Sequence, residues 1–221
     1  MNKKFEFTGE TKAILGNTLH RIRALISFGK VGAGELGGWI EKEENLDASG
    51  NAWVCDDAQV SGNAQVCDDA QVSGNAQVSG NACVYGDAQV CDDAQVSGNA
   101  QVSGNARVYG DARVSGNARV SGNACVYGDA RVSGNARVYK RGAIFWISNV
   151  GSRDDTATFF ACRDKKIKVI VGCFFGDLDG FAAAVQKTHG DNTHAKVYRL
   201  AIEMAKERIK MDDMLEESND G

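Results

Sequence analysis

The chain has 221 residues, with 25 basic and 29 acidic side chains and a formal net charge of -4. This balance argues against a general nucleic-acid-binding protein, which carries a clear basic excess. No apolar run is long enough to cross a bilayer, and Met1-Asn2-Lys3-Lys4 is not followed by the apolar core of a signal peptide. We therefore expect a cytoplasmic protein without membrane contact, in which the seven cysteines are thiols.

The first segment, residues 1–37, is predicted to form a β-rich cap. Short strand patterns flank a predicted hairpin turn at Leu15-Gly16-Asn17-Thr18. The side chains expected to share one face of the second strand are His20, Ile22, Ala24 and Ile26. Such a cap would cover the open backbone ladder at the first end of the repeat that follows.

A six-residue repeat dominates residues 38–146. Ala recurs at every sixth position from Ala52 to Ala136, and a Val follows two positions after each Ala. Residues two apart on a strand point to the same side, so Ala and Val share a buried face. Ile40 and Leu46 are in phase with these Ala residues and would begin the repeat. The Gly-Asn, Gly-Asp and Asp-Asp pairs between strands suit the left-handed backbone of tight corners.

Short strands joined by tight corners predict a parallel β-helix of the hexapeptide type. A six-residue period leaves no room for paired antiparallel strands, and three repeats close one triangular coil. The coils would be stacked roughly 4.8 Å apart.

Residues 147–210 are predicted to form a small α+β domain. The words "TATFFAC" and "IKVIVGCFF" indicate two strands on either side of a turn at residues 163–166. Asp177 suits the N-cap of a first helix that ends at Gly190, and a second helix is expected from Thr193 to Ile209. Residues 211–221 form an acidic tail that we expect to fray.

Several of these words resemble a known family. The words "TLHRIRAL", "GELGGWIEKEENL" and "GNAWV", with the repeats, are similar to the YdcK-like hexapeptide-repeat proteins of bacteria and phages. The words "GSRDDT", "GCFFGDLDGF" and "THGDNTHAKVY" resemble a small domain of unassigned role in phage and prophage proteins. The resemblance implies a left-handed coil and a homo-oligomer, trimer or dimer. If the chain is phage-encoded, it also implies neutralisation of a host defence protein or nucleotide signal.

Many left-handed β-helix proteins are acyltransferases, and this resemblance implies a catalytic histidine near a subunit boundary. The repeat contains no histidine, because the three in the chain are His20, His189 and His194. We therefore expect no catalytic residue, no cofactor and no metal. An acyltransferase-like enzyme and a self-assembling structural protein remain the alternatives.

Two polar sequence segments in the C-terminal domain contain candidate functional residues. "HGDNTH" places His189, Asp191 and His194 within six residues, either as a metal or acid–base cluster or as a helix-to-helix turn. The turn accounts for more of these residues and is favoured. In "GSRDD", Ser152 could be a nucleophile and Arg153 could hold a phosphate or carboxylate, but an ordinary turn between strands is favoured. Cys173 could add a thiolate but is expected in the core.

Charge along the repeat is asymmetric. The outward position between Ala and Val changes from mostly Gln to mostly Arg, which gives a basic collar near the C-terminal domain at Arg107, Arg113, Arg119, Arg131 and Arg137. The collar either supports solubility by pairing with Asp111 and Asp129, or faces an anionic partner.

One face of the triangular coil is rich in aromatic and cysteine side chains. Residues eighteen apart align on neighbouring coils, and the two columns of this face contain Trp53, Cys55, Cys91, Tyr109, Cys125 and Tyr127. Aromatic side chains are enriched at interface centres, so a homo-oligomer is predicted through this face.

These observations favour a non-enzymatic binding or scaffold protein. The repeat would be a rigid spacer and oligomerising rod. The C-terminal domain with the basic collar would engage a protein partner or an anionic small molecule.

Overall fold

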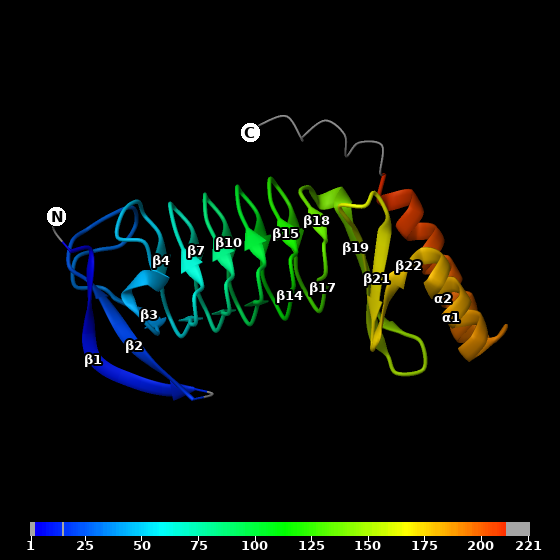
Figure 1. Cartoon of the computed structure of the whole chain (residues 1–221), viewed down its shortest axis with the longest axis horizontal. Coiled ribbons are helices and arrows are strands. Elements are labelled where there is room, and N and C mark those ends of the chain that lie inside the picture. Colours follow the sequence, from blue (N-terminus) through cyan, green and yellow to red (C-terminus); the bar gives the residue numbers. More distant parts are fainter. Residues whose placement is uncertain (1–2, 15, 211–221) are drawn as a thin grey trace.

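The computed structural model describes residues 3–14 and 16–210. It is a rod with three parts in chain order: a β-hairpin, a parallel β-solenoid, and a domain of one sheet and two helices (Figure 1). The predicted mainly β fold, with a parallel β-helix between a β-rich cap and a small α+β domain, is confirmed. The acidic tail expected at residues 211–221 lies outside the described residues.

Between residues 53 and 138 the solenoid consists of fifteen two-residue strands, which at three to a coil make five coils. The strands are β4 (Trp53–Val54), β5 (Gln59–Val60), β6 (Gln65–Val66), β7 (Gln71–Val72), β8 (Gln77–Val78), β9 (Cys83–Val84), β10 (Gln89–Val90), β11 (Gln95–Val96), β12 (Gln101–Val102), β13 (Arg107–Val108), β14 (Arg113–Val114), β15 (Arg119–Val120), β16 (Cys125–Val126), β17 (Arg131–Val132) and β18 (Arg137–Val138).

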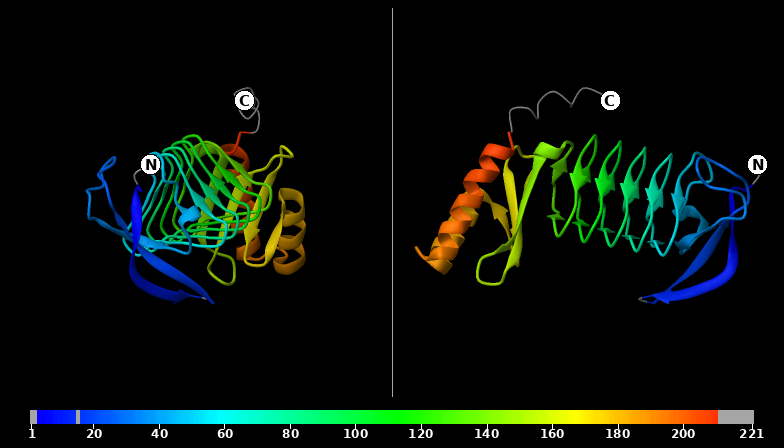
Figure 2. Two further views of the ribbon diagram at one scale, coloured as in Figure 1. Left: turned by 60° about the vertical axis from the view of Figure 1, so that its left-hand side comes forward. Right: turned by 180° about the vertical axis from the view of Figure 1, so that it is seen from behind.

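Every third strand joins the same parallel sheet, so the solenoid has three faces. The β4 face contains β4, β7, β10, β13 and β16, the β5 face contains β5, β8, β11, β14 and β17, and the β6 face contains β6, β9, β12, β15 and β18. The predicted spacing of eighteen residues holds, since Gln89 pairs with Gln71 on one side and Arg107 on the other. Figure 2 shows the coils stacked along the rod.

The core of the solenoid is a column of small and β-branched side chains. Ala94 and Val96 are fully buried, and the other Ala and Val positions of the repeat are equally inaccessible. Because each coil buries its side chains against the coils above and below, the strict hexad is required at every step. This packing explains why the period continues for fifteen repeats.

The corners repeat two hydrogen-bonding devices. Where the corner is Asp-Asp, the first Asp has a left-handed backbone, and its carboxylate accepts the N–H of the glycine one coil further; Asp92 does this with Gly110 at 3.1 Å. Elsewhere glycine takes that position, as at Gly98 with φ +69°. Along the β5–β6 edge a ladder of side-chain amides joins neighbouring coils, from Asn81 to Asn99 at 3.0 Å and from Asn99 to Asn117 at 3.1 Å.

At the N-terminal end, β1 (Phe5–Ile14) and β2 (Asn17–Ala24) form the predicted hairpin, which projects sideways from the rod (Figures 1 and 2). β2 pairs with β3 (Leu36–Ile40), and β3 then pairs in parallel with β5. The face predicted for the second strand is correct for Ile22 and Ala24, which are buried. It is wrong for Ile26, which lies beyond the strand and is 40% exposed.

The phase predicted for the first coil is also wrong. Ile40 pairs with Val60 and Leu46 forms a bridge to Val66, so both occupy Val positions rather than Ala positions. The first coil is therefore two residues longer than the others, and the extra length lies in the corner between Leu46 and Trp53.

The side chain of Lys4 fills this enlarged corner. Lys4 is only 2% exposed, and its ammonium group donates to the backbone carbonyls of Asp47, Ser49 and Ala52 at 3.2, 3.3 and 2.8 Å. Burial lowers the pKa of Lys4 below its ordinary value, while Asp47 opposes this shift. The short 3₁₀ helix η1 (Glu43–Asn45) precedes the corner and completes the cap.

The C-terminal domain has three layers when the last coil is included (Figure 1). After the 3₁₀ helix η2 (Arg141–Ala143), an antiparallel sheet is formed by β19 (Ile144–Val150), β20 (Asp155–Ala161), β21 (Ile167–Val171) and β22 (Phe174–Asp177). This sheet lies between the solenoid and the helices α1 (Leu178–His189) and α2 (Thr193–Arg208).

Two details of this domain differ from the expectation. β19 begins at Ile144 and pairs with β20, so the sheet starts before the boundary expected at residue 147. "IKVIVGCFF" was expected to be one strand, but Gly172 has φ +54° and turns the chain, which gives the hairpin β21–β22. The helix limits agree, because Asp177 and Asn192 are the N-caps and Gly190 ends α1.

The central strand β20 closes the last coil. Its Thr158 hydroxyl accepts the backbone N–H of Arg131 at 3.0 Å, and Arg163 after the strand donates its backbone N–H to Asn135 at 3.3 Å. On the opposite side of β20, Phe159 packs against Phe181 of α1. The C-terminal domain thus covers the backbone ladder at this end beside β17 and β18. Within the described residues, none of the helices has the length and apolarity needed to span a membrane.

Candidate functional site

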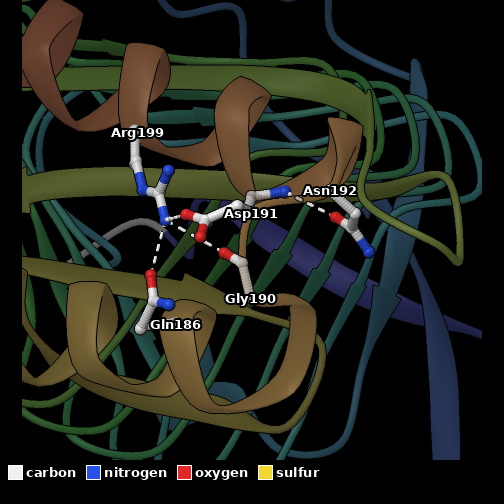
Figure 3. Close-up of polar contacts among 6 residues, drawn as sticks. Gln186, Gly190, Asp191, Asn192 and Arg199 are labelled. Atoms are coloured by element: carbon white, nitrogen blue, oxygen red, sulfur yellow. Dashed lines mark hydrogen bonds and ion pairs between the residues drawn. The ribbon is translucent and has the colours of Figure 1, made fainter.

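The "HGDNTH" segment is the turn between α1 and α2, and Figure 3 shows how it is held. The Arg199 guanidinium group donates to Gln186, to the Gly190 carbonyl at 2.9 Å and to the Asp191 carboxylate at 2.8 Å. Asn192 accepts the N–H of Ala195 as the N-cap of α2. The Asp191 carboxylate is thus engaged by Arg199, which supports the structural interpretation of this segment.

His189 and His194 lie at the two ends of this turn, and their rings are tilted relative to each other. Their ring centroids are 5.7 Å apart, and the His189 ring is 5.8 Å from that of Tyr198. Among the described residues there is no group of three or more His, Cys, Asp or Glu side chains placed to hold a metal ion.

A cavity of about 270 Å³ lies between the sheet and the two helices. It brings together Ser152, Arg153, Cys173 and His189, which come from three separate segments of the sequence. Tyr198 forms part of its wall; burial raises the pKa of that phenol, Asp155 adds to the shift, and Arg153 opposes it. The cavity thus brings Arg153, Cys173 and His189 together, whereas Asp191 and His194 are not part of its lining.

The position expected for Cys173 is wrong. Cys173 is exposed, because it lies in the two-residue turn between β21 and β22 instead of within a strand. Its neighbour Val171 is buried as expected. The thiol therefore borders the cavity from the solvent side.

The basic collar surrounds the solenoid instead of forming one patch. Arg107 is on the β4 face, Arg113 and Arg131 pair in register on the β5 face, and Arg119 and Arg137 pair in register on the β6 face. Within residues 16–210 none of these five side chains forms an ion pair with Asp111 or Asp129, so the pairing expected from the sequence is absent from the described part of the chain. Like charges directly opposite on adjacent strands are unfavourable.

On the β6 face a further arginine joins the pair. Ala136 forms a bridge to Cys162, which places Arg163 beside the last coil. Burial lowers the pKa of Arg137 below its ordinary value, and the nearby guanidinium groups of Arg119 and Arg163 lower it further. We call Arg119, Arg137 and Arg163 the arginine cluster. The sequence alone did not indicate Arg163, since it lies outside the repeat and no period connects it with Arg137.

The aromatic residues of the β4 face each have a contact within the chain. Trp53 is only 1% exposed, because the N-terminal cap covers it and Phe28 packs edge-on against its ring at 5.4 Å. Tyr109 and Tyr127 are stacked with ring centroids 5.1 Å apart. Tyr127 in turn meets the edge of Trp146 from β19 at 4.4 Å.

These contacts correct part of the predicted oligomer interface. Trp53 is not available to a second copy, and Cys125 is also buried. Cys55 and Cys91 remain partly exposed, and Tyr127 is 42% exposed. Since intramolecular contacts account for the aromatic rings, the homo-oligomer stays a prediction that rests on the resemblance and on the exposed remainder of the face.

A family model of the YdcK beta solenoid repeat matches the chain at residues 76–92, 100–116 and 112–128. All three segments lie inside the solenoid, between β8 and β16. No curated protein matches the chain. The predicted relationship is thus confirmed for these segments: the chain contains YdcK beta solenoid repeats, within a β-solenoid that is followed by a small domain of one sheet and two helices.

Proposed function

We propose that this protein is a non-enzymatic binding protein whose C-terminal end engages an acidic protein partner. The solenoid is the rigid spacer that holds this end away from the N-terminal hairpin. Its rigidity follows from the continuous backbone ladders and the column of buried Ala and Val side chains.

The observation that carries the proposal is the arginine cluster. Arg119 and Arg137 pair on adjacent strands, Arg163 lies beside them, and within residues 16–210 none of the three forms an ion pair. The nearest acidic residue in the sequence, Asp164, instead pairs with Lys168 at 3.8 Å. Guanidinium groups suit bidentate contacts with carboxylates, so an acidic surface would neutralise three repelling charges at once.

The position of the cluster favours a macromolecule over a small ligand. Arg119 and Arg163 are exposed on the outer surface at the junction between the solenoid and the C-terminal domain. A protein that contacts them would also reach the neighbouring turn with Lys165 and Lys166, which are exposed as well.

The cavity of the C-terminal domain favours a second candidate function. Because Ser152, Cys173 and His189 border one cavity with Arg153, a small anionic ligand or an acyl-transfer reaction could be located there. The acyltransferase-like alternative predicts release of coenzyme A from acyl-CoA that is lost on His189→Ala. The polymer alternative is disfavoured by the two covered ends of the solenoid.

The identity of the partner is a further proposal that rests on the resemblance to phage proteins. On that basis we propose that the protein captures and neutralises a host defence protein or a nucleotide signal. The cellular compartment would be the host cytoplasm.

A matched pair of variants tests the binding proposal. One variant carries Arg119→Gln, Arg137→Gln and Arg163→Gln, and the control carries Arg107→Gln, Arg113→Gln and Arg131→Gln, so both lose three positive charges. We expect the first to bind a fluorescent polyglutamate peptide about tenfold or more weaker than the control, measured by anisotropy. Equal affinities of the two variants would contradict the proposal. Pull-downs from lysate with the same pair would then identify the partner that depends on the cluster.

A further inference from the structure

A second cavity, of about 480 Å³, lies where the β4 face meets the C-terminal domain. Its volume is within the range of small-molecule sites. Three parts of the chain contribute to it: the last coils, η2 with β19, and the end of α2. The residues that matter here are Tyr109, Cys125, Tyr127, Arg141, Trp146 and Arg208. We call this cavity the junction cleft.

One wall of the junction cleft is aromatic. Tyr109 and Tyr127 are nearly parallel, with 5° between their planes, because they occupy equivalent positions of adjacent coils. Trp146 stands at 90° to Tyr127 and ends the stack, since β19 leaves the solenoid at this point. Tyr127 nevertheless keeps 42% of its surface exposed, so a planar ring can still contact it.

The other wall is cationic. Arg141 and Arg208 are both exposed, and in the described part of the chain neither has a carboxylate partner. Other arginines do, as Arg199 pairs with Asp191 and Arg23 pairs with Glu6. The Arg208 guanidinium group lies against Gly142, where a Cβ would be 3.9 Å from its Nη1.

The aromatic wall also carries polar groups. The Cys125 thiol donates to the Tyr109 hydroxyl at 3.7 Å. This hydrogen bond raises the pKa of Tyr109, and Arg141 is close enough to oppose the shift. The Tyr109 hydroxyl and the Arg141 side chain thus line the same cleft.

We propose that the junction cleft binds a small anion that carries a planar aromatic ring, with the ring against Tyr127 and Trp146 and the phosphate or carboxylate between Arg141 and Arg208. Aromatic side chains bind planar rings by stacking or edge contacts, and paired guanidinium groups favour phosphate and carboxylate oxygens. Nucleoside monophosphates and aryl carboxylates share this chemistry. The site is on a different face from the arginine cluster, so this proposal does not rest on the proposed function.

Calorimetric titrations of the full chain test the ligand class. The probes are adenosine monophosphate, indole-3-acetate, and two half-ligands, inorganic phosphate and adenosine. We expect at least one of the two complete probes to bind about tenfold or more tighter than the half-ligands, because only a complete probe uses both walls. The stronger of the two complete probes would show whether the natural anion is a phosphate or a carboxylate. No binding of either complete probe at millimolar concentration would overturn the proposal.

Variants test the location. Arg141→Gln with Arg208→Gln should weaken binding of the complete probe about tenfold or more while binding of the uncharged half-ligand changes little. Tyr127→Leu should weaken both, and all variants are checked for native circular dichroism. The control Arg113→Gln with Arg131→Gln loses the same charge on the β5 face and should bind like the unchanged protein. Equal weakening in the control and in the cleft variant would overturn the assignment.

Discussion

The hydroxyl of Thr158 accepts a hydrogen bond from the backbone N–H of Arg131 at 3.0 Å, and so joins the C-terminal sheet to the last coil of the solenoid. Thr158 is fully buried. In the preceding coils such a backbone N–H pairs with a carbonyl of the next coil. Because no coil follows the last one, the Thr158 hydroxyl takes the place of that carbonyl. The C-terminal domain is therefore part of the closure of the solenoid, as well as the carrier of the candidate sites.

The first prediction concerns this closure. Thr158→Val keeps the shape of the side chain but leaves the Arg131 N–H without an acceptor. An unsatisfied buried donor costs about 1–3 kcal/mol, so the free energy of unfolding in urea should fall by that amount. Thr158→Ser retains the hydroxyl and should lose less. A valine variant as stable as the parent would show that the hydroxyl does not hold this end.

The second prediction concerns the corners. At Gly98 the backbone is left-handed, and a Cβ would approach the Gly116 nitrogen to 3.0 Å. Gly98→Ala should therefore destabilise the protein by about 1–3 kcal/mol. Gly98→Asp should cost less, because Asp92 occupies the same corner position and its carboxylate binds the N–H one coil further. A higher melting temperature for Gly98→Ala than for Gly98→Asp would contradict this explanation of the corners.

The third prediction concerns a thiol. Burial, followed by the effect of Asp164, raises the pKa of Cys162 to about 12 from an ordinary value of 9.0. Above pH 9 the unfolded chain loses this proton while the folded chain keeps it, so the contribution to stability is complete below that pH and declines above it. The decline should approach about 1.4 kcal/mol per pH unit.

Urea unfolding at pH 8 and pH 10 measures this effect. Cys162→Ala should reduce the fall in stability between the two values, whereas Cys173→Ala, in an exposed turn, should leave it unchanged. An identical pH dependence in the parent and in Cys162→Ala would show that this thiol does not contribute.

The fourth prediction concerns association through the β4 face. We expect light scattering of the parent to give a mass above one chain. Gln89→Arg on the central strand β10, combined with Cys91→Arg directly after it, should reduce the mass to that of one chain. Gln95→Arg with Ser97→Arg, on the polar β5 face, should not. A parent that is a monomer at high micromolar concentration would contradict the predicted interface.

The repeat could be predicted from the sequence because each inward position reports directly on the fold. Ala and Val recur in a buried column for fifteen hexads, as a parallel coil with three strands per turn requires. The helix caps Asp177 and Gly190 could also be predicted, since each forms its capping hydrogen bond with a residue no more than four positions away.

The rest depended on contacts between distant parts of the chain. The phase of Ile40 changes because Lys4 holds an enlarged corner more than forty residues away. Trp53 is buried because the loop with Phe28 folds over it. Arg163 joins Arg137 only through the bridge between Ala136 and Cys162, and the junction cleft needs α2 to return to the solenoid. Contacts between such distant residues cannot be predicted from a local sequence pattern.

The ionic strength dependence of polyglutamate binding tests the central claim most directly. Anisotropy titrations between about 0.05 and 0.5 M salt should show a steep fall in affinity for the parent and for the variant with Arg107→Gln, Arg113→Gln and Arg131→Gln. The variant with Arg119→Gln, Arg137→Gln and Arg163→Gln should bind weakly and with little dependence on salt. An affinity of the parent that is unchanged by salt, or the same salt dependence in both variants, would contradict the arginine cluster as the binding surface.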